Sequence, residues 1–182
     1  MPKATLASGD LVELKECYID IPDLNETITM KILPDISDSK SASYPDEKAI
    51  GRSMPFKSFE NSENRTISWT AHFFVCKDGD QDQILSWMRT LEACTYPQYK
   101  NTGGAPYAPP PICKLRCGAI LSSLEAEDVC CVLKSYSVKF DTSFPWDDVT
   151  FIPYKLDIDL QFDVVYNQAD LPGADKIMTD GY

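Results

Sequence analysis

The strictest alternation of apolar and polar positions in the chain runs from residue 154 to residue 166. Every even position in this stretch is apolar, and the odd positions from 155 to 163 are polar or charged. A period of two is typical of a β-strand with one buried face and one wet face. Thirteen extended residues span roughly 43 Å, whereas a strand usually has about 5–6 residues. The polar positions are Lys155, Asp157, Asp159, Gln161 and Asp163.

Three other stretches predict strands. Apolar and polar positions alternate in 66–76 and again in 128–141, which favours half-buried strands. The segment 112–121 directly follows the three prolines 109–111, and such a run favours a stiff, extended lead-in to a strand. The connection between the last two predicted strands is expected at 144–150.

One helix is predicted at about 81–95. Asp80 or Asp82 can cap its start, because a short acidic side chain accepts hydrogen bonds from the first free amides of a helix. Pro97 is expected to end it. Five apolar residues recur at helical spacing, and we expect this stripe to face the core. They are Ile84, Trp87, Met88, Leu91 and Cys94.

The first third of the chain has weaker patterns, with candidate strands at 11–21 and 27–33. The segment 34–44 contains four serines, and we interpret it as a long loop or mobile arm. We predict that 34–59 reaches a neighbouring subunit, because a segment rich in Ser and Pro cannot build its own core. Three apolar side chains within it need cover: Met54, Phe56 and Phe59.

Strands, one helix and then more strands predict a mainly β fold. We expect an antiparallel β-sandwich or barrel with the helix packed at its side. The 182 residues are enough for one domain with a sizeable core. We assign 1–49 to an N-terminal arm with candidate strands, 50–166 to the β domain, and 167–182 to a tail that forms an arm or is disordered.

The charge of the chain argues against binding to nucleic acid. The formal net charge is −11, and the stretch 144–182 has eight Asp and two Lys, a net of −6. Tight binding to phosphates needs clustered Lys and Arg, so this chain is expected to repel DNA at short range. The sequence also lacks a secretory leader and any run of about 18 apolar residues, which favours synthesis in a cytoplasm.

Seven cysteines without a leader predict reduced thiols, which behave as small apolar residues. A zinc site is the alternative, since Cys113 and Cys117 lie four apart and Cys130 and Cys131 follow. Neighbouring residues of a strand point to opposite faces, however, so Cys130 and Cys131 do not easily hold one ion. We expect no metal or other cofactor.

Candidate catalytic residues are few. His72 is the only histidine, and we expect it at a surface or an interface. No nucleophile elbow, phosphate loop or zinc-protease motif is present. Asp157 and Asp159 lie two apart, about 7 Å between Cα atoms, a spacing that overlaps the carboxylate pairs of glycosidases. Because Gln161 and Asp163 continue the row, a solvated polar face is favoured, and we expect no enzyme activity.

Several motifs follow one another in an order that resembles a known family. They are Ile50-Gly51-Arg52-Ser53-Met54-Pro55-Phe56, Asn64-Arg65-Thr66-Ile67-Ser68-Trp69, Phe73-Phe74, Tyr107-Ala108-Pro109-Pro110-Pro111, Gly118, Val138-Lys139-Phe140-Asp141, and Pro153 before the last strand. This order resembles the tube proteins of contractile injection systems, and especially the baseplate tube-initiator proteins of contractile phages. The resemblance covers about two-thirds of the chain, from 50 to 166.

The resemblance implies a structural virion protein that forms a homo-hexameric ring in the tail baseplate. The inner tail tube would assemble on this ring, and DNA would pass through it without binding. Its partners would be copies of itself, the tail tube protein and baseplate hub and wedge proteins. The predicted lumen-facing residues are Lys155, Asp157, Asp159, Gln161 and Asp163, and the predicted interface residues are Met54, Phe56 and Phe59.

Two alternatives stay open. Within the same class, the chain could be the tail tube protein itself or a baseplate wedge component. From another class, it could be a soluble intracellular β-sandwich that binds a protein. The binding module predicts a monomer with aromatic residues gathered on loops, whereas the tube interpretation predicts a ring with long strands.

Overall fold

Seven strands form one antiparallel sheet in the order β2-β1-β11-β12-β13-β8-β3. The computed structural model describes residues 13–48, 50–51, 53–77, 79–99, 107–121, 128–148, 150–166 and 171. The strands of the sheet are β1 (Leu14–Ile21), β2 (Glu26–Met30), β3 (Asp35–Ser39), β8 (Thr66–Phe74), β11 (Ile112–Cys117), β12 (Val129–Phe140) and β13 (Lys155–Val164).

The mainly β prediction with one helix is confirmed, and the strands predicted from alternation are present. The strand expected over thirteen residues contains ten, β13, paired with β12 on one side and β8 on the other. The strand expected at 112–121 ends at Cys117, because Gly118 turns the chain with φ +54°, a conformation that favours glycine. The segment 14–39, which the sequence placed in the N-terminal arm, supplies β1, β2 and β3.

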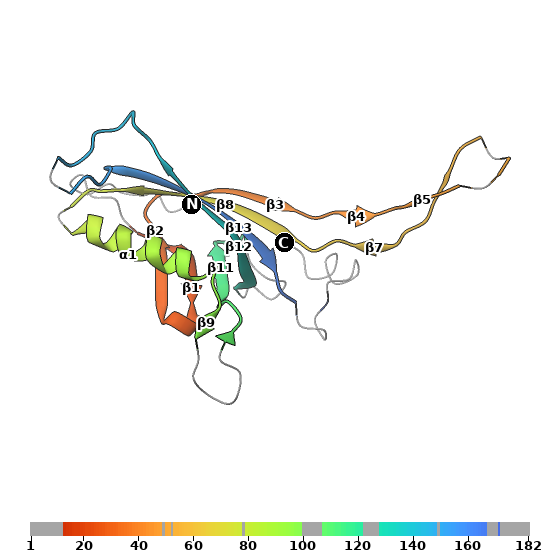
Figure 1. Cartoon of the computed structure of the whole chain (residues 1–182), viewed down its shortest axis with the longest axis horizontal. Coiled ribbons are helices and arrows are strands. Elements are labelled where there is room, and N and C mark those ends of the chain that lie inside the picture. The colour runs from red at the N-terminus through yellow and green to blue at the C-terminus, as the bar shows by residue number, and fades with distance from the viewer. Residues whose placement is uncertain are drawn as a thin grey trace.

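We expected a β-sandwich or barrel, and the barrel is wrong, because the sheet stays open between its edge strands β2 and β3. Only residues 31–34 separate these two strands, yet they do not pair with each other. The helix α1 (Asp80–Ala93) instead lies across the apolar side of the sheet (Figure 1). The helix therefore shields part of the apolar face of the sheet from water, and its buried residues share one core with the strands.

The stripe of α1 is part of the core, as its spacing predicted. Ile84, Trp87, Leu91 and Cys94 are buried, and the Trp87 ring lies 5.7 Å from the ring of Phe73 on β8. The predicted cap is wrong, since neither Asp80 nor Asp82 caps the helix with its side chain. The Asp80 carboxylate instead accepts hydrogen bonds from the amides of the two residues Cys76 and Lys77, which precede the helix.

The serine-rich segment, expected as a long loop or a mobile arm, is not a loop, because it supplies the strands β3 and β4 of a hairpin that projects as an arm. We define the arm as residues 40–65. Beyond β3 it contains β4 (Ala42–Ser43) and β5 (Asp46–Glu47), which pair with β7 (Asn61–Ser62) and β6 (Phe56–Lys57) before the chain enters β8. The arm extends from one end of the sheet, away from the rest of the molecule (Figure 1).

Hydrogen bonds between serine and glutamate side chains hold the arm together. Ser43 Oγ donates to Glu60 Oε2 (3.0 Å), Ser58 Oγ donates to Glu47 Oε1 (2.7 Å), and Ser41 pairs with Glu63 in the same way. At the base, Arg65 donates two hydrogen bonds of 2.9 Å to the carboxylate of Asp38. These polar contacts act together with the ring contact between Tyr44 and Phe59 to stabilise the hairpin.

The remaining elements are short. They are the 3-10 helix η1 (Pro22–Leu24) and the strand pair β9 (Gln98–Tyr99) and β10 (Tyr107–Ala108). The core is one continuous cluster, with the fully buried Trp69 and Phe162 in the longer strands and Ile19 and Leu115 at the other end of the sheet. The predicted C-terminal tail, 167–182, lies outside the described residues except for Leu171.

Candidate functional site

Four neighbouring strands, β3, β8, β13 and β12, present one continuous polar face. Strands lie about 4.8 Å apart, so this face is roughly 15 Å wide. The register of the strands places the following side chains on it: Asp35, Ser37 and Ser39; Thr66, Ser68, Thr70 and His72; Lys155, Asp157, Asp159, Gln161 and Asp163; and Ser135, Ser137 and Lys139. The apolar Phe74 and Val132 lie on the same side, opposite Lys155 and Asp163 at the two ends of the row. The opposite side of the same strands is apolar and packs against the core.

The row predicted on β13 lies in the middle of the polar face, so its carboxylates have neighbours on both sides. Thr70 Oγ1 donates to Asp159 Oδ1 (2.7 Å), and Thr66 Oγ1 donates to Asp163 Oδ1 (3.3 Å). Lys134 Nζ, from a bulge in β12, lies 3.2 Å from Asp163 Oδ2. The face is acidic but largely hydrogen-bonded, which differs from a fully solvated row.

Asp157 is the most enclosed carboxylate of the row, with 15% of its side chain exposed. Its Oδ1 lies 2.7 Å from His72 Nδ1, and its Oδ2 lies 3.0 Å from Lys155 Nζ. His72 Nε2 in turn lies 3.4 Å from Asp35 Oδ2, across the edge of the sheet. The single histidine therefore sits half-buried between two carboxylates.

The environment of Asp157 favours its ionised form. Burial acts to raise the pKa of this carboxyl, but the hydrogen bond from His72 and the Lys155 ammonium outweigh burial and lower the pKa. A carboxyl with a lowered pKa cannot serve as a general acid near neutral pH, because it is deprotonated there.

We predict that Asp157→Asn destabilises the fold by about 1–2 kcal/mol at neutral pH. The folded pKa is below the unfolded one, so the carboxylate stabilises the fold above the unfolded value, and this contribution is lost as the pH falls through the folded value. The wild type should therefore lose stability below about pH 4 more steeply than the variant. Urea unfolding between pH 3 and pH 7 measures both effects.

Asp159→Asn is the matched control, since Asp159 is exposed and accepts a hydrogen bond from Thr70. We expect this substitution to cost less than about 0.5 kcal/mol of the free energy of unfolding. The loss of stability below about pH 4 should be as steep as in the wild type. Equal effects of the two substitutions would contradict the role given to the pair His72–Asp157.

The predicted interface residues lie in the arm. Met54 is 78% exposed, Phe59 59% and Phe56 53%. The Phe59 ring lies 5.6 Å from the ring of Tyr44, on the opposing side of the hairpin, in an edge-to-face arrangement. Packing within the chain thus leaves more than half of each side chain uncovered.

A second exposed apolar surface, which sequence reasoning missed, lies at the other end of the sheet. We call residues 140–154, which join β12 to β13, the aromatic connection. Pairs of rings meet here, with Phe140 6.3 Å from Trp146 and Phe144 6.4 Å from Phe74. The aromatic connection contains five exposed aromatic residues, of which two, Phe144 and Trp146, lie in the stretch 144–150 that the sequence predicted as a connection: Phe140, Phe144, Trp146, Phe151 and Tyr154.

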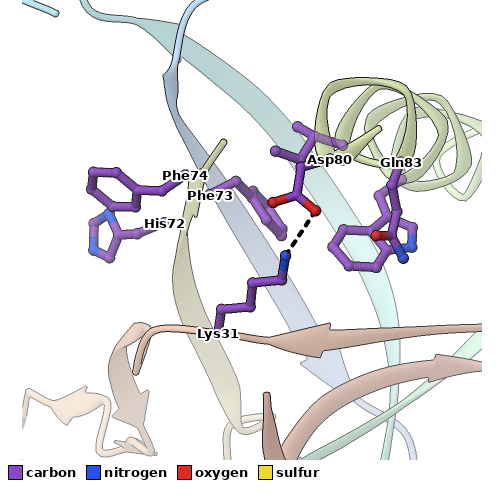
Figure 2. Close-up of a pocket in the computed structure, with 8 residues that line it drawn as sticks. Lys31, His72, Phe73, Phe74, Asp80 and Gln83 are labelled. Carbon is purple, nitrogen blue, oxygen red and sulfur yellow. Dashed lines mark hydrogen bonds and ion pairs between the residues drawn. The ribbon is translucent and has the colours of Figure 1, made fainter. Parts of the chain in front are cut away.

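A small hollow lies between the start of α1 and the strands β2 and β8 (Figure 2). Lys31 reaches across it to Asp80, with 3.1 Å between Nζ and Oδ1. Its volume is about 10 Å³, room for about one water molecule, whereas ligand pockets have about 300 Å³ or more. The hollow is therefore too small for a substrate, and its charged pair joins the helix to the strand β2.

The cysteines divide between core and surface. Cys130 is exposed and Cys131 is buried, which confirms that these neighbours point to opposite faces of β12. The Sγ atoms of Cys17 and Cys117 lie 3.5 Å apart in the core, and burial raises the pKa of the Cys17 thiol. Among the described residues, no group of three or more histidine, cysteine or acidic side chains is placed to hold a metal ion.

Neither a comparison with models of known protein families nor a search of curated proteins finds a match for this chain. None of the described helices is long and apolar enough to cross a membrane. The function is therefore argued from the motifs of the sequence together with the polar face, the arm and the aromatic connection.

Proposed function

We propose that this chain is a structural subunit of a contractile phage tail. In this proposal, copies of the chain form a six-fold tube-initiator ring in the baseplate hub, the inner tail tube assembles on that ring, and DNA passes through it. The chain acts without catalysis or a cofactor, and its place is in the virion, after assembly in the host cytoplasm. Its partners are copies of itself, the tail tube protein and the hub and wedge proteins.

The observation that carries the proposal is the continuous polar face opposite the core. A ring around DNA needs a wall that is wetted on one side, packed on the other, and weakly repulsive to phosphate. The polar face has four Asp against three Lys, one of which is Lys134 beside Asp163, and most of its other side chains are small hydroxyl-bearing residues that do not bind phosphate as charged groups. The long strands β12 and β13 would line the lumen with the row from Lys155 to Asp163.

The arm supports the association of copies. The hairpin protrudes, and three of its apolar side chains stay more than half exposed: Met54, Phe56 and Phe59. Packing on its own chain therefore buries little of their apolar area. Contact with a second subunit would bury these side chains. The tail-tube type of the fold and the placement of the ring are parts of this proposal.

The binding-module alternative draws support from the aromatic connection, because aromatic residues on a loop are typical of recognition surfaces. It differs from the ring in one measurable respect, the mass of the particle in solution. A binding module is expected to be a monomer, whereas the ring has six times 20.4 kDa, about 122 kDa.

We predict that the purified chain forms a hexamer at high protein concentration, and that removing the arm makes it a monomer. The arm can be replaced by Asn-Gly in place of 40–65, because Ser39 and Thr66 face each other in the ladder and suit a two-residue turn. Size-exclusion chromatography with light scattering measures the mass, and circular dichroism checks that the sheet is retained. A full-length chain that stays monomeric at its highest soluble concentration would favour the binding module.

A further inference from the structure

The aromatic connection has an ordered backbone. Asp147 N donates to Ile152 O (3.1 Å), and Phe151 N donates back to Asp147 O (3.0 Å). The Asp147 carboxylate also accepts a hydrogen bond from the amide of Thr150 (3.3 Å). These bonds fix the turn in one shape, so its exposed rings are held in place before any partner arrives.

Phe151 is the residue that folding of the single chain does not explain. Its φ is +54°, the left-handed region that a phenylalanine adopts only at a cost. Its ring is nevertheless 75% exposed, so burial within the chain does not compensate for the strained backbone. Strain at an exposed apolar side chain is typical of a recognition site.

The tip of the arm has complementary chemistry. We define the arm tip as residues 48–57. Residues 46–57 have three basic side chains against two acidic ones, and Lys57 pairs with Asp46 across the hairpin at 3.4 Å, so Lys48 and Arg52 give the tip its positive excess. Residues 140–154 have three aspartates, with Lys139 and Lys155 on either side. Both surfaces are also apolar, since Ile50 and Met54 of the arm tip are exposed, and methionine packs favourably on aromatic rings.

We propose that the arm tip of one copy docks on the aromatic connection of a second copy. The arm and the aromatic connection lie at opposite ends of the molecule (Figure 1), so one chain cannot bring them together. A contact between two different surfaces joins copies head to tail, which builds rings or stacks rather than closed pairs. This proposal rests on the proposed function in requiring that copies of the chain associate, and it names the surface that receives the arm.

The contact is small, so its strength comes from repetition. One tip on one connection buries less area than a stable isolated interface. In a closed or stacked array each copy both gives and receives an arm, and the linked contacts reinforce one another. Association should therefore rise steeply with concentration and weaken with salt, which screens the opposite charges.

The test is a photocrosslink from the arm tip. The photoreactive residue p-benzoylphenylalanine replaces Phe56 in the full chain, and copies labelled with ¹⁴N and ¹⁵N are mixed before irradiation. We expect crosslinked peptides of mixed isotope that join position 56 to residues 140–154. Crosslinks to another surface in an intact assembly would overturn this proposal and leave the ring standing. A chain that stays monomeric and gives no mixed-isotope crosslink would overturn both.

Phe151→Gly separates docking from folding. Glycine adopts the left-handed backbone without strain, so the unfolding temperature should be unchanged or higher. The crosslink yield should nevertheless fall at least about fivefold, as expected for a residue central to an interface. Tyr96→Ser, which removes an exposed aromatic residue outside both surfaces, is the matched control and should leave the yield unchanged. An unchanged yield in Phe151→Gly would overturn the docking site.

Reversing the charges of the two surfaces gives an independent test. Lys48→Glu should weaken assembly, because the tip then faces aspartates of like charge, while the pair of Lys57 with Asp46 that holds the hairpin stays in place. Thr142→Lys with Asp148→Lys, both at exposed positions of the aromatic connection, should also weaken it. A mixture of the two variants should recover crosslinking, because the new glutamate meets the new lysines. Failure of the mixture to recover while both variants remain folded would overturn the charge pairing.

Discussion

Particles that carry Ser68→Lys, Ser137→Lys and Asp159→Lys should release their DNA roughly tenfold more slowly than the wild type. All three side chains are exposed on the polar face. The substitutions leave in place the ion pairs of Asp157 with Lys155 and of Asp163 with Lys134, so the fold should survive. Each copy gains four positive charges, and a ring of six gains twenty-four on the surface proposed to face DNA.

The expected slowing follows from the chemistry of the phosphate backbone. Lysines on the wall attract phosphates and release counterions, which changes a weakly repulsive channel into one that holds DNA. Added salt should partly restore the rate, because screening shortens the reach of the charges. Release of DNA from triggered particles can be followed with an intercalating dye at two salt concentrations.

The control adds the same charge to the other side of the sheet. Ser86→Lys, Glu92→Lys and Ala93→Lys also add four positive charges, and all three residues are exposed on α1. Because α1 covers the apolar side of the sheet, these lysines point away from the polar face. Equal release rates for the two variants would place the polar face outside the DNA channel.

Trp69→Ala should cost about 3–5 kcal/mol of the free energy of unfolding. Trp69 is fully buried in β8, directly opposite Leu160 of β13 and Ile36 of β3. The alanine leaves a large cavity at the centre of the sheet, and a typical domain has only about 5–15 kcal/mol of stability in total. The variant should therefore be close to unfolded at physiological temperature.

Two further substitutions show whether packing is the cause. Trp69 Nε1 has no hydrogen-bond partner among the described residues, so Trp69→Phe removes an unsatisfied donor together with part of the ring. We expect it to cost less than about 2 kcal/mol. Phe140→Ala, at an exposed ring, should cost less than about 0.5 kcal/mol. Chemical unfolding measures all three, and a Trp69→Ala cost below that of Phe140→Ala would contradict this account of the core.

The hairpin arm shows where prediction from the pattern of a single segment fails. Ser37, Ser39, Ser41 and Ser43 repeat with a period of two, which is the spacing of a strand, but the residues are polar and predict a loop by composition. The side-chain hydrogen bonds of Ser41 and Ser43 run to Glu63 and Glu60, 22 and 17 residues away. A sequence pattern that weighs only apolar residues has no means to detect a ladder held by hydroxyl and carboxylate groups.

The polar face was partly predictable for a similar reason. The period of two on β13 assigns Asp157, Asp159 and Asp163 to one face, whatever the partner strands are. It does not say which strands lie alongside. The pairing of His72 with Asp157 joins residues 85 positions apart, and only the register of β8 against β13 brings them together.

The sequence by itself determined the elements whose signal is local: the long strands from their alternation, and the helix from its apolar stripe. It also determined the acidic charge that argues against binding to phosphate. Only the tertiary structure decided that the sheet stays open, that the arm projects from one end, and that the rings of the aromatic connection gather at the other end. These features depend on contacts between residues far apart in the chain, and no periodicity within a single segment encodes them.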